Sequence, residues 1–253
     1  MVQASPERGY LVCSEHRSGS TLLCELLAST GKLGNPDEFL RHTDFAARFE
    51  RDPAVQDEVF KQATSENGVY GLKLFSQQFD VTCKAQWIER LPNLRFIHLV
   101  RMDLLGQAIS LVKALQTDQY FASQSIRAAP RYDRKAIARQ MARIAEGQAR
   151  WRGYFARNGL QPLSLTYEQL VADPIAAVRA VAAHIGVEEE LTPDLARVNV
   201  AVQRDDLSEE WRSRFIHDAG DLNYLDHPYG KPRVWLRRFA RDVAYLMHRA
   251  RRG

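Results

Sequence analysis

The sequence predicts an α/β fold with a mostly parallel sheet flanked by helices, and three observations support this prediction. Four short apolar runs have the length of buried strands, helical patterns separate or follow them, and glycine or proline signals end most of the helices. Strands that alternate with helices are typical of parallel sheets that are covered on both faces. At 253 residues, of which 45% are hydrophobic and 26% charged, the chain has the size and composition of one large globular domain.

Each expected strand is a run of mainly apolar residues that ends at a polar residue or a turn. The runs are Tyr10–Ser14, Gly71–Phe75, Phe96–Arg101 and Pro162–Tyr167. Ligands of open parallel sheets bind beyond the carboxyl ends of the strands. We therefore expect the last residues of these four runs to lie at the functional edge of the sheet.

Helical spacing follows the first run, where Leu22, Leu23, Leu26 and Leu27 fall at positions i, i+1, i+4 and i+5. Similar patterns follow the other runs and end at proline or glycine signals. The expected helices are Thr21–Ser29, Asp80–Arg90, Leu104–Leu115, Asp133–Arg157 and Pro174–Ile185.

Three other segments carry weaker patterns. The charged segment Asp44–Asn67 is expected to form helices over the functional site. The polar segment Gln116–Arg131 is expected to form a lid or a contact within a homodimer. A later helix is expected to open at Ser208, followed by Glu209, Glu210 and Trp211.

Cysteine usage and the N-terminal segment bear on the class of protein. Cys13, Cys24 and Cys83 form no C-x-x-C pair, which disfavours a disulfide framework and a zinc site, so no metal is expected. Met1–Gly9 is polar and lacks the apolar core of a signal peptide, and no apolar stretch reaches 18 residues. We therefore expect a cytoplasmic enzyme.

The positive charge is concentrated near the C-terminus. Residues 231–253 carry eight cations against the single acid Asp242, a net charge of +7, whereas the whole chain carries +4, so residues 1–230 sum to −3. Nucleic-acid binding by the body of the protein is therefore not expected. We divide the chain into a main domain, residues 1–230, and a basic amphipathic helix, residues 231–253.

The most informative segment runs from Tyr10 to Leu23, where an apolar strand leads through a small-residue loop into a helix. Backbone N–H groups and the positive end of the helix dipole bind anions at such a junction. A P-loop nucleotide triphosphatase carries a lysine directly after its last glycine. Here Ser20 follows Gly19, and the cation, Arg17, comes before it. The loop therefore predicts a site for a phosphate-like anion, and an ordinary strand-to-helix turn is the alternative.

This loop resembles the 5′-phosphosulfate loop of sulfotransferases, which use 3′-phosphoadenosine 5′-phosphosulfate (PAPS). Two later segments add to the resemblance, the sequence G-N-P-D-E-F from Gly34 to Phe39, and Arg101 with Ser110 nine residues further on. Together they are similar to the bacterial trehalose 2-sulfotransferase-like family, from about residue 10 to residue 215. The resemblance implies a P-loop-like sulfotransferase fold for residues 1–230, PAPS as the donor, and a hydroxyl of a carbohydrate or glycolipid as the acceptor.

The resemblance also implies roles for individual residues. Glu38 would act as a general base, with an acid at a helix start as the alternative, and Arg17 and Lys73 would stabilise developing charge. Tyr167 would contact the nucleotide or would simply be an aromatic residue at a strand end. The residues implied in donor binding are Arg17, Ser18, Gly19, Ser20, Thr21, Arg101, Ser110, Tyr167 and Arg204.

Plainer interpretations exist for the charged and titratable residues. Arg101 has the alternative of a surface ion pair with Asp103, and a buried Lys73 has the alternative of a core carboxylate as its partner. His42 and His98 are reserve candidates for the base, although a histidine inside a strand is more often part of the core.

Two other classes of function are consistent with parts of the sequence. An ATP-dependent small-molecule kinase would need a lysine in place of Ser20 and an acidic Mg²⁺ ligand where Arg101 stands. A non-catalytic module that binds anionic lipid through its C-terminal segment would leave Glu38 and the Arg101–Ser110 pair without a role.

The C-terminal segment yields a prediction of its own. From Pro232 to Arg249 apolar residues recur at intervals of about three and four, with arginines largely between them. Such a helix either docks on the main domain or lies on an anionic membrane, where each cation adds about 1 kcal/mol of attraction. We expect the full-length protein to co-sediment with anionic vesicles at low salt, and removal of residues 231–253 to abolish this binding. Full-length protein that stays in the supernatant would contradict the membrane interpretation.

Overall fold

The computed structural model describes residues 7–118, 129–189, 191–196 and 206–219. The chain divides into two compact units, Met1–Arg212 and Ser213–Gly253. The basic helix expected at 231–253 and the donor contact expected at Arg204 lie outside the described residues, as does most of the segment expected to form a lid.

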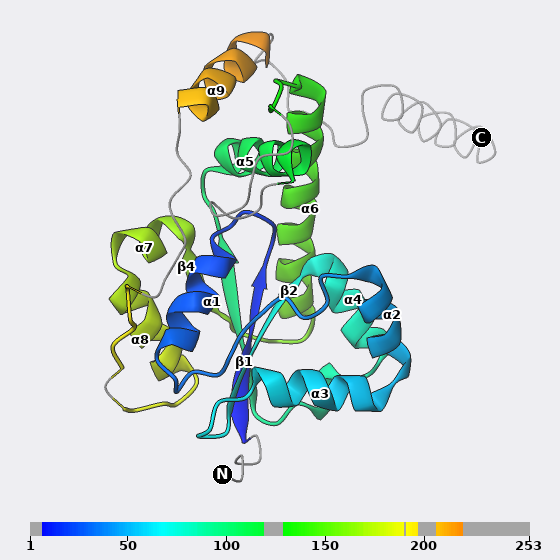
Figure 1. The fold of residues 1–253 in the computed structure, drawn as a ribbon, viewed down its shortest axis with the longest axis vertical. Coiled ribbons are helices and arrows are strands. Elements are labelled where there is room, and N and C mark those ends of the chain that lie inside the picture. Colours follow the sequence, from blue (N-terminus) through cyan, green and yellow to red (C-terminus); the bar gives the residue numbers. More distant parts are fainter. Residues whose placement is uncertain (1–6, 119–128, 190, 197–205, 220–253) are drawn as a thin grey trace, which may run out of the picture. The chain divides into compact units, whose positions relative to one another are not determined.

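The larger unit is built on a sheet whose four strands, among the described residues, are all parallel. β1 (Arg8–Ser14) pairs with β2 (Val69–Phe75) on one side and with β3 (Leu94–Val100) on the other, and β4 (Leu163–Thr166) pairs with β3 (Figure 1). The strand order is β2-β1-β3-β4. β1 and β2 are buried over almost their whole length, as expected when helices cover both faces of a parallel sheet. The predicted α/β fold is confirmed.

Apolar side chains form one core cluster on each face of the sheet. The first cluster includes residues of α1 (Ser20–Ser29) and α8 (Pro174–His184), and the second includes residues of α3 (Pro53–Ala63), α4 (Ser76–Lys84) and α6 (Arg134–Arg157). The other described helices are α2 (Thr43–Arg51), α5 (Leu104–Thr117), α7 (Tyr167–Ala172), α9 (Asp206–Ala219) and the 3-10 helix η1 (Ile88–Arg90).

The helix expected at Asp80–Arg90 is placed differently in the structure. α4 begins four residues earlier, because the Gln78 side chain accepts a hydrogen bond from the Phe75 N–H at 2.9 Å and so caps the first turn. It ends at Lys84, and Gln86 follows with a left-handed φ of 50° that interrupts the helix before η1. The helical pattern was therefore found, but its boundaries depend on a local capping contact.

Two expected strands are one residue too long at their carboxyl ends. β3 ends at Val100, so Arg101 is the first residue beyond it. β4 ends at Thr166, which is the N-cap of α7. The Thr166 hydroxyl accepts a hydrogen bond from the Gln169 N–H, and the Gln169 side chain accepts one from the Thr166 N–H. Tyr167 therefore begins a helix. The expectation that these residues lie at the carboxyl edge of the sheet is met.

A buried carboxylate connects the end of β1 with two helices. The Glu15 side chain accepts a hydrogen bond from the backbone N–H of Ser76, the first residue of α4, at 3.3 Å. Burial raises the pKa of Glu15, and the hydrogen bonds from Ser76 oppose this shift. A Cβ atom on Gly147 of α6 would lie only 2.3 Å from the carboxylate. The glycine is therefore needed for the close approach of α6 to Glu15.

This close approach predicts opposite effects for two glycines of one helix. Gly147→Ala is expected to destabilise the protein by about 1 kcal/mol or more, because the buried carboxylate must leave its place at α4. Gly153→Ala is the matched control, since nothing lies within 4 Å of its added Cβ, and alanine should stabilise the helix by about 0.5–1 kcal/mol. Urea unfolding of both variants measures the difference. Equal stabilisation by both substitutions would show that Glu15 moves without cost.

Candidate active site

The loop between β1 and α1 has the backbone geometry of an anion-binding turn. Gly19 is the N-cap of α1 with a left-handed φ of 85°, and Arg17 also lies in the left-handed region with a φ of 61°. A left-handed arginine carries backbone strain of about 1 kcal/mol or more, and such strain clusters at functional sites. Two hydrogen bonds hold the backbone of the loop. The Ser18 N–H donates to the Glu15 carbonyl, and the Gln107 side chain donates to the His16 carbonyl.

The polar groups of this loop fit a bound anion. No side chain caps the N-terminus of α1, so its first N–H groups face outward at the positive end of the helix dipole. Within the described residues, the buried Ser18 Oγ has no hydrogen-bond partner. A buried hydroxyl without a partner is costly, and a phosphate or sulfate oxygen would satisfy it.

A second group of charged side chains gathers around Glu38. Its carboxylate lies 3.6 Å from Lys73 Nζ and accepts a hydrogen bond from the Gln78 side chain at 2.9 Å. Lys73 projects from β2, and its side chain is 4% exposed, whereas that of Glu38 is 15% exposed. The carboxylate compensates for the burial of the lysine charge. Glu38 is not at a helix start, because the preceding helix ends at Ser29 and the next begins at Thr43.

His16 also belongs to this group, although no motif in the sequence singled it out. Its ring lies against Phe75, with ring centroids 3.9 Å apart. Desolvation lowers the pKa of His16, Glu38 opposes this shift, and the charges of Lys73 and Arg17 add to it. The His16 side chain is exposed, so it lies at the open side of the group.

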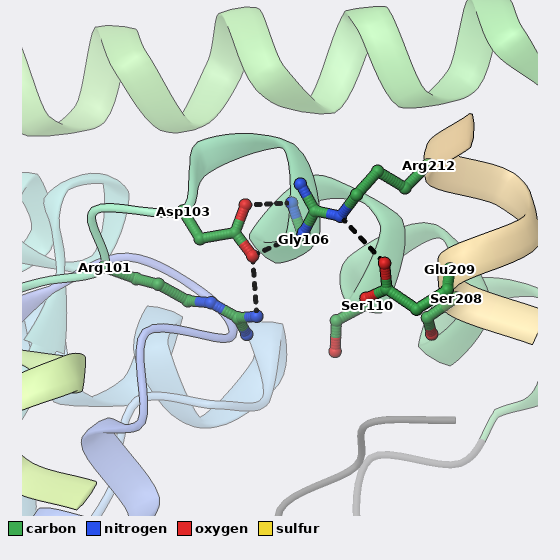
Figure 2. Close-up of a pocket in the computed structure, with 7 residues that line it drawn as sticks. All are labelled: Arg101, Asp103, Gly106, Ser110, Ser208, Glu209 and Arg212. Atoms are coloured by element: carbon green, nitrogen blue, oxygen red, sulfur yellow. Dashed lines mark hydrogen bonds and ion pairs between the residues drawn. The ribbon is translucent and has the colours of Figure 1, made fainter. Parts of the chain in front are cut away.

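A pocket lies beyond the carboxyl end of β3. Its lining comes from Arg101, from the first half of α5, and from α9. Figure 2 shows Arg101 and Arg212 pointing toward one carboxylate, that of Asp103, at 3.4 Å and 2.6 Å. The lining residues are Arg101, Asp103, Gly106, Ser110, Ser208, Glu209 and Arg212.

The two arginines of this pocket are balanced by two acids, since both pair with Asp103 and Arg212 also pairs with Glu209 at 3.6 Å. Burial alone would raise the pKa of Asp103, but hydrogen bonds from Arg212 and Gly106 and the charges of both arginines outweigh it and lower the pKa. Within the described residues, the buried Arg101 Nε has no hydrogen-bond partner. The plainer interpretation of Arg101, an ion pair with Asp103, is therefore present, but it leaves a donor of the guanidinium unused.

The loop and the pocket are joined by direct contacts. Arg17 Nε donates a hydrogen bond to Ser110 Oγ at 2.9 Å. The Arg101 guanidinium lies over the Tyr167 ring, 4.9 Å from its centroid, and a Cβ on Gly19 would lie 2.4 Å from the same ring. The structure therefore brings Arg17, Gly19, Arg101, Ser110 and Tyr167 close to one another.

The reserve bases lie away from this arrangement. His98 is buried in β3 beside Phe155, and burial, with a smaller effect of Arg152, lowers its pKa to about 4. It is a core histidine. His42 is exposed at the N-terminus of α2.

The sequence did not single out Gln78 or Arg212, and it indicated Asp103 only as an ion-pair partner of Arg101. Gln78 precedes the helix expected from Asp80, and Arg212 is one of many arginines in the last 50 residues. Gln78 contacts Glu38, which lies 40 residues earlier in the sequence. Arg212 contacts Asp103, which lies 109 residues earlier. Only the expected helix at Ser208 indicated that the region around Arg212 would be ordered.

Neither a metal centre nor a membrane span is found in the described part of the chain. No group of three or more His, Cys, Asp or Glu side chains there could hold a metal ion. None of the described helices is long and apolar enough to cross a bilayer.

Comparison with known proteins gives relatives along most of the chain. A trehalose 2-sulfotransferase of Mycobacterium tuberculosis is 28% identical, covering 85% of this chain and 97% of that protein, and one of Mycolicibacterium smegmatis is 27% identical, covering 83% and 95%. Among solved structures, a sulfotransferase domain from the curacin biosynthetic pathway aligns with a TM-score of 0.49 at 15% identity, covering 87% of this chain and 93% of that one. The Stf0 sulphotransferase family model matches residues 9–218, and the chain therefore belongs to the Stf0 sulphotransferase family.

Proposed function

We propose that this sulfotransferase moves a sulfuryl group from PAPS to a hydroxyl of a carbohydrate or glycolipid acceptor, giving a sulfate ester and 3′-phosphoadenosine 5′-phosphate. The observation that carries the proposal is the hydrogen bond from Arg17 to Ser110. It links an anion loop at a helix N-terminus to a second, arginine-lined pocket. PAPS carries a 3′-phosphate apart from its 5′-phosphosulfate, whereas ATP has one continuous phosphate chain. Two linked anion sites therefore fit PAPS better than ATP.

The donor would be held by residues of both sites. The loop residues Arg17 to Thr21 would hold the phosphosulfate through N–H groups, hydroxyls and the Arg17 charge. Arg101 and Ser110 would hold the 3′-phosphate. The Tyr167 ring packs against the Arg101 guanidinium. Arg212 provides a second guanidinium in the same pocket, in the part of the chain where Arg204 was expected to act.

Glu38 would remove the proton from the acceptor hydroxyl as its oxygen attacks sulfur. The new bond joins sulfur to the acceptor oxygen, and the bond that breaks joins sulfur to the bridging phosphate oxygen. Negative charge then grows on that phosphate oxygen. Arg17, Lys73 and the N–H groups of the loop would stabilise this charge, and preorganised donors of this kind usually make the largest contribution to catalysis.

The alternatives considered from the sequence are weaker. Family membership makes the protein an enzyme of the sulfotransferase class, which a non-catalytic lipid-binding module does not explain. A kinase would need a lysine at Ser20 and an acid at the end of β3, where Arg101 stands.

The acceptor is proposed from the named activity of the relatives. Both mycobacterial relatives are trehalose 2-sulfotransferases, so trehalose is the first acceptor to test, followed by other disaccharides, glucosides and glycolipids. Incubation with PAPS labelled on sulfur should transfer label to at least one of these hydroxyl compounds. Absence of transfer to the whole panel, in a protein that is folded, would overturn the proposed function.

A further inference from the structure

Gln78 contacts the proposed base with one end of its side-chain amide and the start of α4 with the other. Its Oε1 accepts from the Phe75 N–H at 2.9 Å, and its Nε2 donates to Glu38 Oε1 at 2.9 Å and to the Leu40 carbonyl at 3.3 Å. A backbone N–H can only donate, so the atom facing Phe75 must be the amide oxygen, and the NH₂ group must face Glu38. The orientation of the amide is therefore fixed by its surroundings.

This contact leaves the two oxygens of Glu38 with different neighbours. Oε1 accepts from Gln78, whereas Oε2 faces Lys73 Nζ at 3.6 Å, beyond a hydrogen-bond distance. Besides Lys73, the charged or titratable side chains that interact with Glu38 among the described residues include His16, Cys24 of α1 and Asp37, whose carboxylate accepts from the Glu38 N–H. Oε2 is thus the oxygen that can still accept a proton from a hydroxyl.

The first turn of α4 also holds the anion loop. The N–H of Ser76 donates to Glu15, whose carbonyl accepts from the Ser18 N–H of the loop. Gln78 holds Glu38 from the same turn. One helix start therefore fixes the position of the base and of the loop together.

We propose that Gln78 is a positioning residue for the sulfuryl transfer: it holds Oε1 of Glu38 so that Oε2 is presented to the acceptor hydroxyl. The inference rests on the proposed function, because it assumes that Glu38 is the base. Misplacement of a reacting group by about 1 Å can cost on the order of 100-fold in rate. Loss of the Gln78 contact should therefore lower kcat while leaving donor binding intact.

Three variants separate positioning from helix capping. Gln78→Glu keeps an oxygen for the Phe75 N–H, and glutamate suits this capping position as well as glutamine does. It cannot donate to Glu38 and places a second carboxylate against it. Gln78→Leu removes both contacts. Gln169→Leu is the matched control, because Gln169 makes the same amide-to-backbone cap at α7, to Thr166, and touches neither Glu38 nor Lys73 in the hydrogen bonds described.

The expected results differ among the three. Gln78→Glu should keep the cap of α4 but unfold somewhat below the parental temperature because of the second carboxylate; at a temperature where it is folded, it should bind 3′-phosphoadenosine 5′-phosphate within about twofold of the parent and lose roughly ten- to a hundredfold in kcat. Gln78→Leu should lose kcat and unfold at a lower temperature. Gln169→Leu should unfold at a lower temperature with parental kcat at saturating donor, because its cap lies at Tyr167 and not at Glu38.

The outcomes distinguish the inference from the proposed function. Parental kcat in Gln78→Glu, on an acceptor that the parent sulfates, would overturn the role of Gln78 and leave the proposed function standing. A loss of kcat in Gln169→Leu as large as in Gln78→Glu would also overturn it, since capping alone would then explain the effect. A folded parent that sulfates nothing in the acceptor panel would overturn both.

Discussion

Replacement of Glu38 by glutamine is expected to lower kcat by roughly 100-fold or more, while affinity for 3′-phosphoadenosine 5′-phosphate stays close to that of the parent. Glutamine keeps the size of the side chain but cannot take the hydroxyl proton. The carboxylate lies outside the anion loop and the Arg101 pocket, so the donor should bind as before. Initial rates with labelled PAPS, together with calorimetry of the bisphosphate product, measure the two quantities separately.

The change also removes the charge that neutralises Lys73, whose side chain is 4% exposed. A fall in the unfolding temperature is therefore expected, and kcat must be measured below it. Asp37→Asn is the matched control, because Asp37 is the adjacent carboxylate, is exposed, and pairs with Arg41. It should retain parental kcat. Parental turnover in folded Glu38→Gln would exclude Glu38 as the base.

The second large effect concerns the choice of nucleotide. The parent should bind 3′-phosphoadenosine 5′-phosphate far more tightly than adenosine 5′-phosphate, and Arg101→Ala should erase most of this preference. A hydrogen bond between charged groups contributes about 1.5–3 kcal/mol, which corresponds to roughly ten- to a hundredfold in affinity. The unused Arg101 Nε supplies such a donor. Calorimetry with both nucleotides, with and without a metal chelator, measures the preference, and the chelator should change nothing.

An exposed arginine provides the control for a general loss of positive charge. Arg139→Ala on α6 should lower both affinities little and equally. Equal affinity of the parent for the two nucleotides would overturn the 3′-phosphate role of Arg101 and the use of PAPS. An unchanged preference in Arg101→Ala would instead place the 3′-phosphate elsewhere.

The sequence predicted the parts of this protein that are encoded locally. The apolar run before Ser14 and the small residues up to Thr21 specify a strand, a turn and a helix start within a dozen residues. The carboxyl ends of the strands were predicted within one residue, because these strands end where polar residues begin, whereas the starts of β1, β2 and β3 were each placed two residues too late. The start of α4 was missed because it depends on the side chain of Gln78, not on apolar spacing.

Only those residues of the candidate site that belong to a recognisable sequence motif could be predicted. The pairing of Glu38 with Lys73 joins a loop to a strand 35 residues further on, and no local pattern reports such a contact. Arg212 meets Asp103 because α9 comes to the end of β3, which propensity and periodicity do not show. Long-range polar contacts depend on how helices and strands pack together. Local sequence patterns predict the helices and strands but not their packing.

The strand pairing has a consequence for how the chain folds. Arg8 pairs with Val69 and Gly9 with Leu94, so the first strand meets its two neighbours only after 61 and 85 further residues. Each pairing must overcome the entropy of closing a long loop, and long-range pairing in parallel sheets is intrinsically slow. During synthesis the apolar segment Tyr10–Cys13 would leave the ribosome well before either partner. Nascent chains shorter than about 100 residues are therefore expected to expose this segment to chaperones or to aggregation.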